Sequence, residues 1–184
     1  MTNRIMTTML MLLLIKLSLG AQTPQDIKTT YDKFKDVTTV SGTRLFEHFK
    51  TSTVSVGIGV VLQVSGNKIV EPNKLDLIFM EFDDFTKNSD GEWWAIADGE
   101  RIRLGKILAT SKPVLSTGSL TIKQHYGVTT VSSEVFRKLA KANKVEMKIG
   151  TFEITEGRGK LWNDLQASRS LYREILNLID QGKK

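Results

Sequence analysis

Alternation of apolar and polar residues is the main pattern along this chain, and it predicts mostly β-strands. Over residues 53–65 the apolar side chains occupy every second position, and Gly57 and Gly59 fall on the opposite face. Such a period of two is typical of a strand with one buried face. We expect the two glycines to leave a shallow trough that another backbone or a bend can occupy.

Two further segments are apolar on both faces. Residues 75–85 and 93–97 show this two-sided pattern, which predicts strands that are covered on both sides. Because residues 86–91 between them are rich in turn formers, we expect the two strands to form a central hairpin with a long tip. Asp98 and Gly99 then predict a second, tight turn into a short strand at residues 101–104.

Helical periodicity appears twice in the second half of the chain. Ser132 or Ser133 is placed to cap a short helix near residues 133–142, and apolar residues three, four and seven apart predict a helix near 160–180. Shorter strands are expected at residues 120–128, 145–149 and 152–154. The pattern predicts an α+β domain, mainly antiparallel β-sheet or sandwich-like, whose C-terminal helix covers the second face of the Trp-rich hairpin.

The N-terminus has the order of features of a secretory signal peptide. Arg4 precedes an apolar stretch that ends in small residues, and we expect cleavage after Gly20 or Ala21. The apolar stretch is shorter than the roughly 20 residues that a membrane span requires. Lys16 within the stretch is atypical, and it leaves retention of the segment open as an alternative.

Composition fits a globular protein that leaves the cytoplasm. The chain has 184 residues, 40% of them hydrophobic and 25% charged, with no cysteine and a formal charge of +6. Loss of residues 1–20 would remove two lysines or arginines and no acid, leaving residues 21–184 as one mildly basic domain in the periplasm or outside the cell. Because basic and acidic residues are interspersed, we expect no nucleic-acid partner. The absence of cysteine excludes thiol catalysis and thiolate metal sites.

Two segments, residues 31–40 (YDKFKDVTTV) and residues 131–155 (VSSEVFRKLAKANKVEMKIGTFEIT), carry a resemblance to known proteins. Together they resemble small exported bacterial proteins of uncharacterised function. The resemblance implies export and a domain closed by a strand, a short helix, two strands and a final helix. It implies no catalytic residue.

Residues typical of catalysis or metal binding are sparse. His48 and His125 are the only histidines, neither lies in a metal-ligand spacing, and the chain has no G-x-S-x-G motif. Residues 83–92 weakly resemble a calcium loop but fit a hairpin tip better. Residues 157–160 lack the pattern of a phosphate loop and read as a flexible lead into the last helix. We therefore predict no cofactor and no metal site.

Two groups of side chains are candidates for binding. Trp93 and Trp94 are a possible stacking platform for a sugar or another planar group, although apolar neighbours favour packing in the core. Asp32 and Asp36 are candidate partner contacts beside Tyr31, with a structural ion pair of Asp32 as the alternative. Together with the glycine trough, these residues are the predicted sites.

These observations support two hypotheses about function. The first is an exported, non-catalytic module that binds a protein or an envelope component through a sheet edge or the trough at Gly57 and Gly59. The alternative is a carboxylate-dependent hydrolase of an envelope polymer, with Glu81 and Asp83 on one face and Asp84 on the other. Weak attraction of anionic polymers by the scattered lysines and arginines ranks below both.

Overall fold

The computed structural model describes residues 27–47, 55–82, 91–117, 120–150, 152–157 and 159–182, and the predicted signal peptide lies outside them. In chain order the elements are β1 (Lys28–Asp32), β2 (Val37–Glu47), β3 (Ser55–Ser65), β4 (Lys74–Phe82), β5 (Glu92–Ala97), β6 (Glu100–Lys106), β7 (Leu108–Thr117), β8 (Leu120–Ser132), α2 (Ser133–Lys141), β9 (Val145–Ile149), β10 (Phe152–Ile154), α3 (Lys160–Ser168) and α4 (Ser170–Gln181). Strands dominate, with short helices in the second half of the chain.

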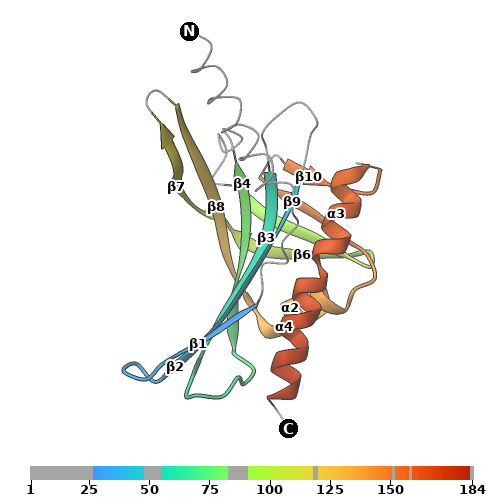
Figure 1. The fold of residues 1–184 in the computed structure, drawn as a ribbon. Helices are drawn as coiled ribbons and strands as arrows, with labels where there is room; N and C mark the ends of the chain where they lie inside the picture. Colours follow the sequence, from blue (N-terminus) through green and yellow to red (C-terminus); the bar gives the residue numbers. More distant parts are fainter. Residues whose placement is uncertain are drawn as a thin grey trace.

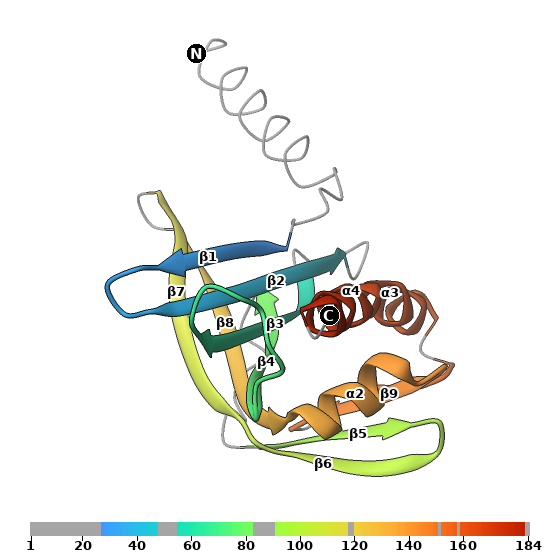
Figure 2. The same cartoon turned by 90° about the horizontal axis from the view of Figure 1, so that it is seen from below.

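The strands form two antiparallel sheets. The six-stranded sheet has the order β1-β2-β3-β4-β8-β7, and the four-stranded sheet has the order β10-β9-β5-β6. Figures 1 and 2 show α2, α3, α4 and the smaller sheet on one side of the larger sheet. This arrangement confirms the α+β class that the sequence predicts.

The core lies where the larger sheet meets the helices and the smaller sheet. Ile58 and Val60 of β3 are fully buried, and they lie in register with Phe79 and Leu77 of β4. Phe79 packs edge-on against Trp93 of β5, with 6.2 Å between the ring centroids. The alternating residues of β3 and β4 thus supply one wall of the core, and β5 supplies the facing wall.

The prediction of a hairpin between residues 75–85 and 93–97 is wrong. β4 pairs with β3 and β8 in the larger sheet, whereas β5 pairs with β6 and β9 in the smaller sheet. A polar, turn-rich segment between two apolar strands has the same sequence pattern whether it closes a hairpin or crosses between sheets. The tight turn at Asp98 and Gly99 is confirmed, because both residues have positive φ and join β5 to β6.

Among the described residues, the smaller sheet is covered on one face only, which corrects the expectation that β5 is buried on both. Trp93, Ala95 and Ala97 are at most 6% exposed, but Ile96 on the opposite face is 39% exposed. Trp94 on that face lies under the Arg101 guanidinium, 4.3 Å from the ring centroid. The two-sided pattern predicts a covering helix here, and an arginine side chain lies over the aromatic ring instead.

The helices confirm the predicted positions and correct one contact. Ser132 caps α2 by accepting a hydrogen bond from the Val135 backbone N–H. The C-terminal helix is divided into α3 and α4 at Arg169, and both helices contact β2 of the larger sheet, while α3 also contacts β10 of the smaller sheet. At Gly42 of β2 an added Cβ would lie 2.6 Å from a methyl group of Leu171 of α4, so any larger residue would force Leu171 to shift.

Candidate functional site

The β1–β2 hairpin carries both acids that the sequence selects as partner contacts. Oδ1 of Asp32 accepts hydrogen bonds from the backbone N–H groups of Phe34 (2.9 Å) and Lys35 (3.3 Å). Asp36 adopts a φ of 52°, and its Oδ1 accepts a hydrogen bond from the Tyr31 hydroxyl at 2.8 Å. That hydrogen bond raises the pKa of Tyr31. Both carboxylates shape the turn, and Asp32 bonds backbone groups rather than the expected cation.

β1 is the outermost strand of the larger sheet. In the described part of the chain it has a strand neighbour on one side only, and all five of its residues are exposed. A strand in this position presents a row of N–H and C=O groups that can pair with another chain. The opposite edge strand, β7, contains Pro113 and a register shift between Pro113 and Leu115. Because proline and a bulge interrupt pairing, β1 is the more regular edge.

The glycine trough faces away from the core. Gly59 lies opposite Thr43 of β2 and Ile78 of β4, and an added Cβ would lie 2.9 Å from Thr43 Cγ2. The methyl group of Thr43 therefore fills the space beside Gly59. Gly57 is likewise buried between β2 and β4. The structure explains the glycine at position 59 by close packing of neighbouring strands.

The two tryptophans lie on opposite faces of β5. Trp93 is fully buried, and its Nε1 is without a hydrogen-bond partner within the described residues. It therefore belongs to the core and forms no surface. Trp94 is half-buried, with Arg101 over its ring and Ile96 beside it on the same face. A ring already covered by a guanidinium offers a planar ligand only its remaining exposed area.

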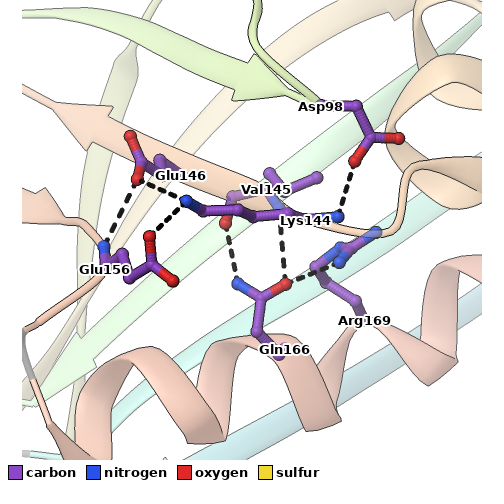
Figure 3. A network of polar contacts seen from close by, with 7 residues as sticks. All are labelled: Asp98, Lys144, Val145, Glu146, Glu156, Gln166 and Arg169. Atoms are coloured by element: carbon purple, nitrogen blue, oxygen red, sulfur yellow. Dashed lines mark hydrogen bonds and ion pairs between the residues drawn. The ribbon is translucent and has the colours of Figure 1, made fainter.

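A polar network joins the smaller sheet to α3 and α4, as Figure 3 shows. The side chain of Gln166 bonds the backbone of Val145 twice, as an acceptor at 3.3 Å and as a donor at 2.8 Å. Arg169 Nη1 donates to the same Gln166 oxygen at 2.7 Å. At the edge of the network, Lys144 forms an ion pair with Glu156. The sequence analysis did not predict this network, because its members are far apart along the chain.

Arg169 is fully buried at the centre of this network. Its guanidinium donates to carbonyl oxygens of Leu139 (3.1 Å), Ala142 (2.6 Å) and Asn143 (3.4 Å). Desolvation lowers the pKa of Arg169. These carbonyls end α2, where the last turn lacks intrahelical partners and the helix dipole is negative. Arg169 therefore caps α2 from inside the protein, which is a structural role.

An open groove of about 470 Å³ runs between α2 and the β5–β6 turn. Its lining contains Asp98, Glu100, Glu134, Arg137, Lys138, Lys141, Ala97 and Ala142. The groove mixes both signs of charge, and Lys138 is paired with Glu100 at 2.8 Å. Arg137 is bound by Asp180 and Glu71, which raise its pKa. The groove therefore offers no surface of one sign to a charged ligand.

The sheet register brings together three residues typical of hydrolases. His125 of β8 lies opposite Glu81 of β4 on one side and Ser111 of β7 on the other. The sequence analysis named Glu81 and His125 separately and could not pair them. Asp83, Asp84, His48 and residues 85–90 of the calcium-like segment lie outside the described residues.

Comparisons with protein-family models, curated proteins and solved structures gave no match. Within the described ranges, no three acids, histidines or cysteines lie together in a way that holds a metal ion. No helix in that part of the chain is long and apolar enough to cross a bilayer. Function is therefore argued from the surfaces above.

Proposed function

We propose that this chain is an exported, non-catalytic module that binds an extended polypeptide segment along β1. The observation that carries the proposal is the position of β1, which is exposed along its whole length at the regular edge of a six-stranded sheet. An incoming strand would gain backbone hydrogen bonds without any change in the core. Export remains part of the proposal through the signal-like N-terminus.

The chemistry of β1 favours a polypeptide partner over a small ligand. Thr29 and Thr30 are β-branched and suit cross-strand pairing, and Lys28 and Asp32 place opposite charges at the two ends. These charges would fix the direction of an added strand that carries the complementary pair. Because only five residues are available, binding would be of the weak, transient class.

Proline substitutions in β1 test the proposal. The backbone N–H groups of successive strand residues point to opposite edges of the strand. Of the two variants Thr29→Pro and Thr30→Pro, one therefore removes a donor that points outward, and the other removes a donor that points toward β2. The full chain is immobilised and exposed to envelope and culture-supernatant extracts at two salt concentrations. We expect the folded variant lacking the outward donor to lose partners that the wild type retains saturably at high salt. Unchanged capture by both variants, or no saturable capture by the wild type, would contradict the proposal.

A further inference from the structure

One end of the larger sheet is built from two adjacent connections, which we call the hairpin end. It comprises the β1–β2 turn, residues 33–36, and the β3–β4 loop, residues 66–73. The two are tied together because the Gly66 backbone N–H donates to the Asp36 carbonyl at 2.8 Å and the Thr38 hydroxyl donates to the Gly66 carbonyl at 2.6 Å. Figure 1 shows both connections at the same end of the molecule as the C-terminus of α4, and Figure 2 looks onto that end.

Exposed apolar side chains gather at this end. Five large apolar side chains are well exposed among the described residues, and three of them belong to the hairpin end or adjoin it. Phe34 is 90% exposed at the turn, Tyr31 just before it is 47% exposed, and Val70 in the adjacent loop is 44% exposed. An almost fully exposed phenylalanine contributes no burial to the fold, so its position at a turn points to an external contact.

Two lysines flank Phe34 at the tip of the hairpin end. Lys33, Lys35 and Lys68 are exposed, and the ammonium of Lys33 lies 5.2 Å from the centroid of the Phe34 ring.

The neighbouring acids Asp32 and Asp36 are also exposed, but their carboxylates are bound by groups of the hairpin itself. Asp32 accepts backbone N–H groups of the turn, and Asp36 accepts the Tyr31 hydroxyl. Glu71 and Asp180 are both bound to Arg137. The outward surface therefore combines lysines with an aromatic ring and leaves its acids occupied.

We propose that the hairpin end docks on an anionic lipid surface. Phe34 enters the boundary between headgroups and acyl chains, and the flanking lysines contact the anionic headgroups. Two lysines on either side of one inserted aromatic ring are complementary to such a membrane in both charge and polarity. The contact is peripheral and reversible, and it does not depend on strand binding at β1.

Site-specific labelling provides the test, because the chain contains no cysteine. Phe34→Cys and Val70→Cys are each labelled in the full chain with a polarity-sensitive fluorophore, and Leu108→Cys and Ile96→Cys are matched exposed controls. Each protein is mixed with vesicles of phosphatidylcholine alone or of equal phosphatidylcholine and phosphatidylglycerol. We expect a blue shift at positions 34 and 70 with the anionic vesicles only, and no shift at 108 or 96. This local readout is independent of any lipid contact made by the N-terminal segment.

A charge variant completes the test. Lys33→Gln combined with Lys35→Gln should lower the affinity of the position-34 label for anionic vesicles about 30-fold, equivalent to about 2 kcal/mol. An unshifted label at position 34 on anionic vesicles would overturn the proposal and direct attention to an acidic protein or polysaccharide. Equal shifts on both kinds of vesicle, or at all four positions, would also overturn it.

Discussion

The cluster around Arg169 and the hairpin end use polar residues in opposite ways. At Arg169 the guanidinium is fully buried and its donors are directed at carbonyl oxygens of α2 and at Gln166. At the hairpin end Lys33 and Lys35 remain in solvent beside Phe34, which is 90% exposed. In the first region the hydrogen-bond donors find acceptors within the chain, whereas in the second region charged and apolar side chains remain exposed.

This difference separates residues that maintain the fold from residues available for binding. A buried cation needs compensating oxygens, so every partner of Arg169 is also a constraint on how α2, α3 and β9 are placed. Exposed lysines and an exposed ring place no such constraint on the core. Substitutions in the two regions should therefore differ in whether they change stability or binding.

The largest expected effect is that of Arg169→Met. Methionine fills much of the volume but leaves the carbonyls of Leu139, Ala142 and Asn143 buried without these donors. We expect a loss of about 3–5 kcal/mol in the free energy of unfolding, measured by urea denaturation. Arg103→Gln, which breaks only the exposed pair with Glu92, is the matched control and should cost less than about 1 kcal/mol. Equal losses in the two variants would contradict the structural role of Arg169.

The elements with strong local signals were predictable from the sequence. Alternation in β3, the Ser132 cap of α2 and the Asp98–Gly99 turn each depend on neighbouring residues, and the structure confirms all three. The pairing of β4 and β5 was not predictable, because sheet partners are determined by contacts distant in sequence. The pattern around Trp94 was misleading, since the Arg101 guanidinium lies over that ring.

The candidate site was predictable only in part. The sequence drew attention to Asp32 and Asp36, yet their carboxylates shape the turn, and Phe34 between two lysines is the most exposed large apolar side chain of the described residues. Local alternation of residue types could not identify which side chain the turn projects. The Arg169 cluster was missed entirely, because a helix cap supplied from another helix leaves no local pattern.

The contribution of Asp98, at the edge of the buried cluster, to stability should depend on pH. Its carboxylate accepts the backbone N–H groups of Asn143 and Lys144, and these hydrogen bonds lower the pKa of Asp98. A lowered folded-state pKa stabilises the protein above the unfolded value of about 3.9, and this contribution is lost as pH falls through the folded value. Asn tolerates the positive φ at this turn, so Asp98→Asn removes the charge and keeps the backbone.

We therefore expect wild type and Asp98→Asn to differ in urea midpoint at neutral pH and to converge as the solution is acidified toward about pH 2. Convergence would show that the difference in stability comes from the ionised carboxylate of Asp98. Two curves that stay parallel over this range would show that the charge of Asp98 makes no contribution.

The smallest expected effect on stability is at the hairpin end. Lys33→Gln, Phe34→Ser and Lys35→Gln in one chain remove its outward side chains but keep the turn hydrogen bonds, which use backbone N–H groups and the acids on either side. Because these side chains bury almost no area, the free energy of unfolding should stay within about 0.5 kcal/mol of wild type. The same variant should lose its affinity for anionic vesicles, so stability and binding would separate in one protein. A loss of stability well above that range would place Phe34 and its lysines with Arg169 among the residues that maintain the fold, and the contrast between the two regions would fail.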